Sequence, residues 1–328
     1  MAICWTLHHT RPHTLCDGLF LIQVHIQNMN IFSIIVTWNA MQRGWIDRCL
    51  QSLQASTVPI TAIVVDNLST DGTREYLPAH YPDTIWLPQD RNLGFGQANN
   101  VGIRYALEHQ ADYVLLLNQD AALAPDAIEK MLAVSDGESL LSPLHLNGDG
   151  TRIDELFRYS LRQSVNLMAD DLLIRYQLSP SYESAEICAA CWFMPVALIR
   201  KIGGFNPLFF HYSEDNNYYH RLQYHGVKTL LVPDTFMFHD RLLQGNGQAY
   251  NRHRLRRDLI LEACNINQGF LKCVSRWIKV LVHCYITDLP AHQYRIGAFT
   301  LQMLWLTAHI TSIHKSRKTE RQTGLIWL

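Results

Sequence analysis

Polar side chains that could bind a ligand follow the apolar runs in the first part of this chain. Four runs each end in such residues, which are Thr37-Trp38-Asn39, Asp66-Asn67, Asn92 with Gly94, and Asn118-Gln119-Asp120. Carboxylate and amide groups can hydrogen-bond a base edge or a ribose, and a carboxylate can hold a hard cation. Glycines in the third group would let backbone N–H groups approach an anion.

Two adjacent carboxylates, Glu214 and Asp215, follow an aromatic-rich stretch later in the chain. A carboxylate can take a proton from a hydroxyl group, and the aromatic neighbours suit a bound sugar. These neighbours are Phe209, Phe210, Tyr212, Tyr218 and Tyr219. A purely structural alternative is that the two acids stabilise a helix start through the helix dipole.

The elements that position these residues alternate between strand and helix. Apolar, β-branched runs predict strands at 31–36, 60–65, 84–87 and 111–117. Helical patterns lie at 45–55, around 76–77, at 96–109 and at 125–133. This alternation predicts a parallel sheet, on which ligands bind outside the carboxyl ends of the strands. The polar residues should therefore meet at one edge of the sheet.

The second half of the chain is less regular. Strands are expected at 140–146, 186–194 and 227–232, and helices at 195–202 and from Glu214 to Tyr224. The segment 149–184 is polar and weakly patterned, so we expect mainly loops there.

Taken in order, several motifs resemble family 2 glycosyltransferases of the GT-A fold, over about Asn30 to Asp240. The motifs are SIIVTWNA, VVDNLSTDGT, NLGFGQANNVGI, LLLNQDA, GGFNPLFFHYSEDNNYYHR and VPDTFMFHD. The most similar subgroup includes rhamnosyltransferases that build bacterial surface polysaccharides. The resemblance implies an α/β fold, with a Rossmann-like, mostly parallel sheet flanked by helices, followed here by a helical C-terminal tail.

The resemblance also implies a nucleoside-diphosphate-sugar donor. Asp66 would read the nucleotide base, and further residues would line the donor site, namely Thr37, Asn39, Asn67, Asn92, Gly94, Asn100, Asn118 and Arg221. The structural alternative for Asp66 is an Asx-turn that closes the strand, with help from Asn67 and Ser69.

A metal site is implied by the Asn118-Gln119-Asp120 motif, where the family usually carries Asp-X-Asp. Asp120 would hold Mg²⁺ or Mn²⁺ against the donor diphosphate, and His239 would be a second ligand. Because Asn118 replaces the first aspartate, one negative charge is missing. The alternatives are that Asp120 caps the turn before Pro125 and that His239 is structural.

Catalysis is assigned by resemblance to Asp215 as the base, with Glu214 as the second choice. The implied reaction is inverting transfer of the sugar to a hydroxyl group of a saccharide or lipid-linked saccharide. One alternative is a non-catalytic sugar- or nucleotide-binding relative that acts as a scaffold. A nucleotidyltransferase would need a glycine-rich, basic loop after the first strand, which Thr37-Trp38-Asn39-Ala40 does not provide.

Composition narrows the class of protein. The 328 residues are 48% hydrophobic and carry a formal net charge of -1, so nucleic acid is not expected as a partner. The eight cysteines include one CxxC pair, Cys188 and Cys191, without a second pair at zinc spacing. We expect buried thiols and a cytoplasmic protein, with peripheral contact to the inner face of the plasma membrane as an option.

The two ends of the chain differ from its centre. We expect translation to start at Met29, so residues 1–28 would be disordered or spurious, and a signal peptide is not expected. The catalytic domain should span 29–260. Residues 261–328 should form helices, one with a basic face from Lys272, Arg276 and Lys279 that suits an anionic membrane. The alternative is a helical subdomain that covers the core.

Overall fold

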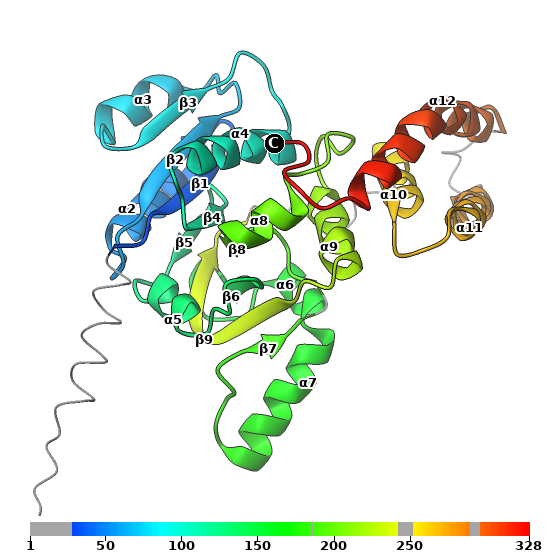
Figure 1. The fold of residues 1–328 in the computed structure, drawn as a ribbon. Coiled ribbons are helices and arrows are strands. Elements are labelled where there is room, and N and C mark those ends of the chain that lie inside the picture. Colours follow the sequence, from blue (N-terminus) through cyan, green and yellow to red (C-terminus); the bar gives the residue numbers. More distant parts are fainter. Residues whose placement is uncertain (1–27, 185, 242–251, 289–295) are drawn as a thin grey trace, which may run out of the picture.

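A mixed nine-stranded sheet forms the centre of the protein, in a computed structural model that describes residues 28–184, 186–241, 252–288 and 296–328 (Figure 1). The strand order is β3-β2-β1-β4-β8-β6-β9-β5, and β7 also pairs with β9. Residues 1–27, including nearly all of the predicted N-terminal extension, lie outside the described ranges.

The first half of the sheet is parallel, as predicted. It consists of β1 (Ile31–Thr37), β2 (Thr61–Asp66), β3 (Ile85–Pro88) and β4 (Tyr113–Leu117). Its central strands are buried on both faces, which explains their continuous apolar runs. The register of β1 and β2 sets Thr37 opposite Asp66. Two of the predicted donor-site residues are thus neighbours because of backbone pairing alone.

The second half is mixed in direction and differs from the prediction in its strand lengths. It consists of β5 (Ala121–Leu123), β6 (Leu140–Asn147), β7 (Tyr182–Glu183), β8 (Cys191–Pro195) and β9 (Thr229–His239). We expected the last strand to end at Val232, but it continues to His239. A register shift against β6 leaves residues 233–235 unpaired there, and this irregularity accommodates Pro233, which has no N–H to donate.

Helices cover both faces of the sheet, and each face has its own apolar core. The helices α2 (Trp45–Gln54), α3 (Thr73–His80) and α5 (Ala127–Ala133) pack on one face. The helices α4 (Phe95–Glu108), α8 (Val196–Ile202) and α9 (Glu214–Tyr224) pack on the other. A short 3₁₀ turn, η1 (Gln42–Gly44), precedes α2. Cys191 is a free, buried thiol in one of these cores, as expected, and Cys188 is a free, half-buried thiol beside it.

The segment 149–184 is helical, so the expectation of mainly loops was wrong. It forms α6 (Glu155–Ser160), α7 (Arg162–Asp170) and the π-helical turn η2 (Asp171–Arg175), and α7 projects from the body of the protein (Figure 1). Leu173 and Ile174 are about three-quarters exposed, at 76% and 73%. These two apolar side chains of η2 therefore do not face a core, whereas Phe157 of α6 does.

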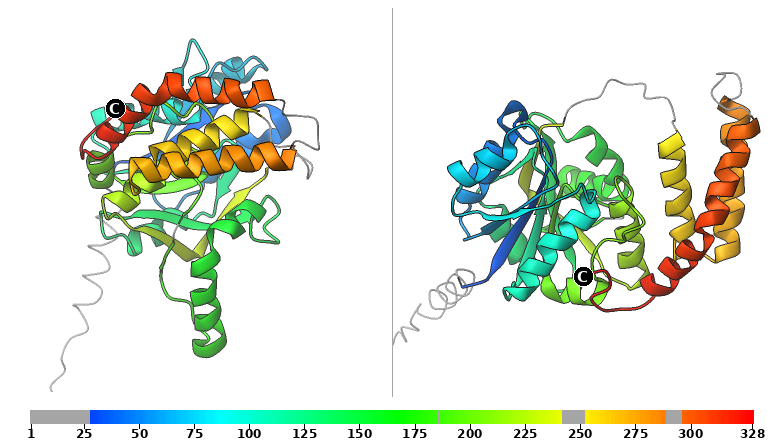
Figure 2. Two further views of the ribbon diagram at one scale, coloured as in Figure 1. Left: turned by 90° about the vertical axis from the view of Figure 1, so that its right-hand side faces the viewer. Right: turned by 90° about the horizontal axis from the view of Figure 1, so that it is seen from above.

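Three C-terminal helices lie side by side as a separate layer (Figure 2). They are α10 (Arg252–Cys264), α11 (Phe270–Asp288) and α12 (Ile296–Glu320). A small core that includes Phe209, Cys264 and Ile313 joins this layer to the loop before α9. The predicted boundary at residue 260 falls inside α10. Within the described ranges, no helix combines the length and apolarity needed to cross a membrane.

Gly94 makes the closest contact between the start of α4 and the loop before α9. Its φ of +76° is unfavourable for other residues, and a Cβ there would lie 1.8 Å from the carbonyl oxygen of Phe210. Gly137 has nearly the same φ, +75°, but a Cβ there would meet nothing within 4 Å. Comparing the same substitution at the two glycines therefore separates the cost of a positive φ from the cost of the steric contact with Phe210.

We predict that Gly94→Ala lowers the free energy of unfolding by at least about 2 kcal/mol more than Gly137→Ala does. Both variants force a side chain into the left-handed region, but only Gly94→Ala must also displace the backbone of Phe210. Thermal unfolding of the two variants measures the difference. Equal losses would contradict the contact between α4 and this loop.

Candidate functional site

Asp66 lies at the carboxyl end of β2, in a fully buried position with both carboxylate oxygens occupied. Thr37 Oγ1 donates to Oδ1 at 3.2 Å, and the backbone N–H of Ser69 donates to Oδ2 at 3.1 Å. Arg74 Nε also donates to Oδ2, at 2.7 Å. This is the arrangement that the Asx-turn alternative predicted, strengthened by an ion pair. The role of Asp66 in reading a base stays a prediction.

The amide side chains at the ends of β1, β2 and β3 connect neighbouring loops. Asn39 Oδ1 accepts from the backbone N–H of Thr70 at 2.9 Å. Asn67 Oδ1 accepts from the backbone N–H of Leu93 at 2.7 Å, and Asn67 Nδ2 donates to Asn92 Oδ1 at 2.9 Å. Asn92 Oδ1 also accepts from the backbone N–H of Gly94. The structure thus brings most of the predicted donor-site residues to one edge of the sheet.

Asn100 and Arg221 were also predicted to line the donor site, but both hydrogen-bond the backbone of the segment after α8. The Asn100 amide exchanges two hydrogen bonds with the backbone of Phe205, at 2.8 and 2.6 Å. Arg221 is fully buried and donates to the carbonyl oxygens of Ile202 and Gly204 at 2.9 and 2.6 Å. In this structure both side chains fasten the segment after α8, so we do not place them in the donor site.

The predicted metal ligands Asp120 and His239 meet because β5 pairs with β9. Ala121 lies opposite His239 in this ladder, and the backbone N–H of Asp240 donates to the carbonyl oxygen of Asp120 at 2.9 Å. His239 Nε2 then lies 3.2 Å from Asp120 Oδ1. The side chain of His239 is buried, at 1% exposure, whereas that of Asp120 is 21% exposed. Asp120 is thus the member of the pair that a solvent-borne ligand could reach.

Asp154 and Arg241 extend this pair, and neither was predicted. Asp154 caps α6 through the backbone N–H of Phe157, and its Oδ2 accepts from Arg241 Nε at 3.0 Å. The same oxygen lies 3.9 Å from His239 Nδ1. The sequence contained a weak signal for Asp154, an aspartate directly before Glu155 at a helix start. For Arg241 there was none, because its partner lies 87 positions away.

These residues fit a cation that is shared with a substrate better than one enclosed by the protein. Among the residues that the structure describes, no three His, Cys, Asp or Glu side chains form a metal-binding group. Mg²⁺ is often held by one or two carboxylates together with substrate phosphates, so Asp120 with His239 is a sufficient protein contribution. Within the described ranges Asn118 Oδ1 is buried without a hydrogen-bond partner, as is expected of an atom that binds a ligand.

Glu214 and Asp215 occupy the first turn of α9, with different surroundings. Glu214 is 5% exposed, and its Oε2 has no hydrogen-bond partner among the described residues. Burial, together with the charge of Asp215, raises the pKa of Glu214 to about 8. Burial also raises the pKa of Asp215, against the opposing effects of the backbone N–H groups of Asn216 and Ala189 and the charge of Arg241.

Arg241 connects the acid pair to the metal pair. Its guanidinium binds Asp154, which borders His239, while its charge acts on Asp215. Cys188 lies between them, because its sulfur accepts from Arg241 Nη2 at 3.7 Å and its pKa responds to Asp215. Short contacts thus connect Asp120 and His239 to Asp154, Arg241 and Cys188, and the charge of Arg241 lowers the pKa of Asp215. That Asp215 faces the same site as Asp120 stays a prediction.

The aromatic surround expected for a sugar is only partly available. Phe209 and Tyr218 are buried in the core, so their assignment was wrong, whereas Phe210 and Tyr212 are 57% and 59% exposed. Arg257, from α10, stacks over Tyr212 at 5.0 Å from the ring centroid, and its charge lowers the pKa of Glu214. No sequence pattern near Arg257 indicated this contact, which depends on how α10 docks.

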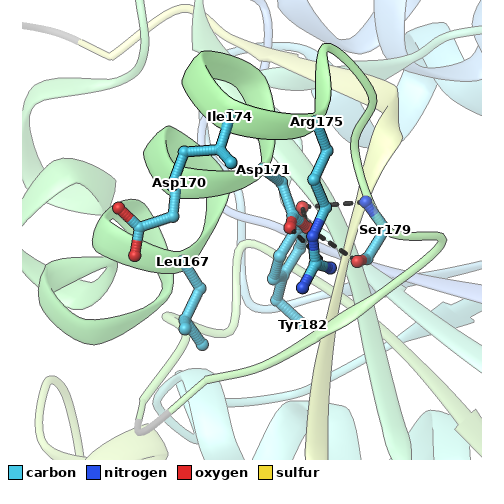
Figure 3. Close-up of a pocket in the computed structure, with 7 residues that line it drawn as sticks. All are labelled: Leu167, Asp170, Asp171, Ile174, Arg175, Ser179 and Tyr182. Carbon is cyan, nitrogen blue, oxygen red and sulfur yellow. Dashed lines mark hydrogen bonds and ion pairs between the residues drawn. The ribbon is translucent and has the colours of Figure 1, made fainter.

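A separate cavity of about 410 Å³ lies beside the projecting α7 (Figure 3). Asp171 forms its polar side, because Oδ2 accepts hydrogen bonds from Tyr182 and Ser179 and Oδ1 binds Arg175. Leu167 and Ile174 form its apolar side. It contains none of the residues predicted for the site. Asp154 and Cys188 flank in the sequence the segment that lines it, which runs from Leu167 to Tyr182.

Comparison with known proteins identifies the family of this chain. The profile of the family described as “Glycosyl transferase family 2” matches residues 33–201, about half of the chain. The chain belongs to glycosyl transferase family 2. The match extends from β1 to α8 and so includes the donor-site edge and Asp120.

Two curated relatives transfer rhamnose. The chain is 24% identical to the N-acetylglucosaminyl-diphospho-decaprenol L-rhamnosyltransferase of Mycobacterium tuberculosis, over 60% of this chain and 72% of that protein. It is also 24% identical to the dTDP-rhamnosyl transferase RfbF of Shigella flexneri, over 65% of this chain and 69% of that protein. The resemblance to a family 2 glycosyltransferase of a rhamnosyltransferase-like kind is confirmed.

Solved structures share the fold at low sequence identity. The mannosyltransferase PcManGT of Pyrobaculum calidifontis, in complex with GDP-Man and Mn²⁺, superposes with a TM-score of 0.52 at 15% identity, covering 93% of this chain and 92% of that one. GalNAc-T7 with UDP, GalNAc and Mn²⁺ gives a TM-score of 0.56 at 14% identity; the match covers 91% of this chain but only 55% of that one. The predicted GT-A fold is confirmed.

We predict that Glu214 makes stability depend on pH. Its folded pKa is raised above the unfolded value, so its contribution is most favourable below about pH 4.5 and is lost as the pH rises through about 8. Glu214→Gln should therefore become more stable than the wild-type protein at about pH 9, by on the order of several kcal/mol. Chemical unfolding at several pH values measures this, with the exposed Glu138→Gln as the control. Parallel pH curves for all three proteins would contradict the burial of an unpaired Glu214.

Proposed function

We propose that this chain transfers a sugar from a nucleoside-diphosphate sugar to a hydroxyl group of a saccharide or lipid-linked saccharide, with inversion, in the synthesis of a cell-surface polysaccharide. The observation that carries the proposal is the connection of Asp120 and His239 to Asp215 through Asp154 and Arg241. In this proposal these groups carry two functions that the reaction needs, holding a diphosphate and removing a proton.

Asp215 is the base in this proposal. It takes the proton of the acceptor hydroxyl while that oxygen bonds to the anomeric carbon, and the bond from this carbon to the diphosphate oxygen breaks. Burial raises the pKa of Asp215, which makes its carboxylate a better proton acceptor than an exposed aspartate. The charge of Arg241 opposes this rise and favours the ionised form of Asp215.

Asp120 and His239 would hold the cofactor, Mg²⁺ or Mn²⁺. When bound, such an ion supplies positive charge that offsets the charge on the leaving diphosphate. Asn118 could accept a hydrogen bond from a ribose hydroxyl through its Oδ1, which has no partner within the described part of the chain, and could donate to a phosphate oxygen through its Nδ2. The nucleotide would lie along the edge formed by Thr37, Asn39 and Asn67.

Rhamnose is the sugar that the relatives favour for this chain. Both curated relatives described above are named for rhamnosyl transfer, and one of them is named for a lipid-diphosphate acceptor. Phe210 and Tyr212 provide exposed aromatic surface next to Glu214 on which an acceptor sugar could stack.

We also propose that α11 contacts an anionic membrane on the cytoplasmic side. Leu271, Ile278 and Val282 are exposed on this helix at 84%, 47% and 42%. Lys272 and Lys279 are exposed beside them, and α11 has no acidic residue before Asp288. An exposed apolar stripe with a basic neighbour suits the interface of an anionic bilayer, where a lipid-linked acceptor would be found.

The proposed reaction predicts that substitution of Asp215 impairs catalysis, whereas substitution of Asp120 impairs metal-dependent donor binding. Asp215→Asn should lower kcat by about 10²–10⁴-fold while donor binding persists, because only the proton acceptor is removed. Asp120→Ala should instead abolish the extra rise in melting temperature that Mn²⁺ gives in the presence of the donor. Sugar transfer and thermal shift with dTDP-rhamnose and other nucleotide sugars measure both effects.

The exposed Asp83→Asn is the control for these two variants and should behave like the wild-type protein. Full activity in Asp215→Asn would refute its role as the base and would favour Glu214. A wild-type protein that binds donor but never transfers sugar would support the scaffold alternative.

Membrane contact predicts that a Lys272→Glu/Lys279→Glu double variant binds vesicles of three parts phosphatidylcholine and one part phosphatidylglycerol at least about tenfold more weakly. Transfer to a water-soluble acceptor should not change. A charge-matched control, Arg104→Glu/Lys201→Glu, alters exposed residues of α4 and α8 and should bind like the wild-type protein. Equal vesicle binding by all three proteins in flotation would contradict the proposal.

A further inference from the structure

The loop between α8 and α9 ends in a strained backbone directly before the acid pair. Tyr212 and Ser213 both have φ of +67°, and neither is a glycine. Each such residue costs about 1–3 kcal/mol and persists only where the surrounding contacts impose it. Glu214 and Asp215 follow immediately, so whatever holds this loop also sets the position of the acid pair.

One carboxylate oxygen of Glu320 accepts hydrogen bonds from residues near both ends of this loop. Glu320, the last residue of α12, is fully buried, and its Oε1 accepts from Asn206 Nδ2 at 2.6 Å and from Asn217 Nδ2 at 2.8 Å. Asn206 lies near the start of the loop, and Asn217 lies in the first turn of α9, after the acid pair. Ser316 Oγ adds a third hydrogen bond to the same oxygen, at 3.2 Å.

The two asparagines that bind Glu320 also form hydrogen bonds within the backbone at the two ends of the loop. Asn206 Oδ1 accepts a hydrogen bond from the backbone N–H of Leu208 at 3.0 Å. The backbone carbonyl oxygen of Asn206 accepts one from the backbone N–H of Phe209 at 3.1 Å. At the other end, the backbone N–H of Asn217 donates to the carbonyl oxygen of Ser213 at 3.0 Å. Both amides that bind Glu320 therefore also define the turns that enter and leave the loop.

Glu320 is itself firmly anchored. Its carbonyl oxygen lies 2.8 Å from His225 Nε2, beyond the end of α9. The neighbouring Arg317 donates to the carbonyl oxygens of Ala263, Asn265 and Gln268, at 2.9, 2.6 and 2.6 Å, which ties α12 to α10. The charge of Arg221 acts favourably on the buried carboxylate.

We propose that Glu320 is a positioning residue for sugar transfer, which clamps the Asn206–Asn217 segment and thereby holds Glu214 and Asp215 in their reactive place. The residue lies outside the part of the chain that the family profile matches, so the C-terminal helices contribute to the active site as well as to membrane contact. The proposal rests on the function proposed above, because it concerns the placement of the same acid pair.

The clamp has a distinctive kinetic consequence. The donor-site edge at β1 and β2 is held by its own hydrogen bonds, among them that of Thr37 to Asp66, and shares none with Glu320. Loss of the clamp should therefore displace the base without loosening the donor. A general loss of folding would impair both together, so the ratio of the two effects distinguishes positioning from mere stability.

The experiment compares Glu320→Ala, Glu320→Gln and Glu262→Ala in the full-length protein. Glu320→Ala leaves the buried Asn217 amide without its acceptor and the Asn206 amide with Ser316 Oγ alone. We expect kcat to fall at least about tenfold while the donor KM changes less than about threefold. Glu320→Gln retains an oxygen acceptor and should restore most of kcat. Glu262 binds Arg276 at 3.0 Å within the same helical layer, so Glu262→Ala is the matched control and should keep full activity.

Hydrogen–deuterium exchange provides a readout that needs no enzymatic activity. In Glu320→Ala, exchange should rise in residues 206–217 and stay unchanged in 31–37. Unchanged exchange in 206–217, or equal losses in kcat and donor binding, would overturn the clamp. If the wild-type protein transfers no sugar from any donor while exchange still rises in 206–217, the proposed function fails and the clamp stands. If Glu320→Ala does not fold, unchanged kcat and exchange in Asn217→Ala, which removes one of the two amides that bind Glu320, would overturn it.

Discussion

The pairing of β5 with β9 is the interaction on which the site depends. This short antiparallel ladder sets Ala121 opposite His239 and so brings Asp120 within hydrogen-bonding distance of the histidine. Because side chains alternate along a strand, a slip of one residue would turn His239 to the opposite face. From His239 the contacts continue through Asp154 to Arg241, whose charge also lowers the pKa of Asp215. A ladder of only a few backbone pairs thus holds the two residues that we propose to bind the metal ion.

Burial of acidic groups is the second constraint, and it acts on both sides of α9. Glu214, Asp215 and Glu320 all have their pKa raised by burial. Arginines moderate each case, with Arg257 near Glu214, Arg241 near Asp215 and Arg221 near Glu320. Burying an isolated carboxylate costs free energy. The nearby arginine charges therefore favour a helix α9 that carries Glu214 and Asp215 in its first turn and binds Glu320 through Asn217. The same contacts couple the C-terminal helices to the site.

The parallel half of the sheet could be predicted because each strand is an apolar run that ends in polar residues, and backbone register alone then joins Thr37 to Asp66. The strand β5 was missed because Ala121–Leu123 is too short to show a pattern. Pro233 concealed the second part of β9. Asp154, Arg241 and Arg257 were missed for another reason, since each acts on a partner distant in the sequence. Asn100 and Arg221 illustrate a different limit of the sequence, because both bond the segment after α8 and polar residues inside a motif can serve the fold as well as a ligand.

The central claim is that Asp120 and Asp215 face one bound donor from its two ends. Anomalous scattering at the manganese edge, from crystals soaked with Mn²⁺ and a non-transferable nucleotide sugar, tests it most directly. The account predicts one manganese peak within coordination distance of Asp120 and His239, with the sugar carbon between that ion and the Asp215 carboxylate. A manganese ion bound elsewhere, or a donor whose sugar points away from Asp215, would contradict it.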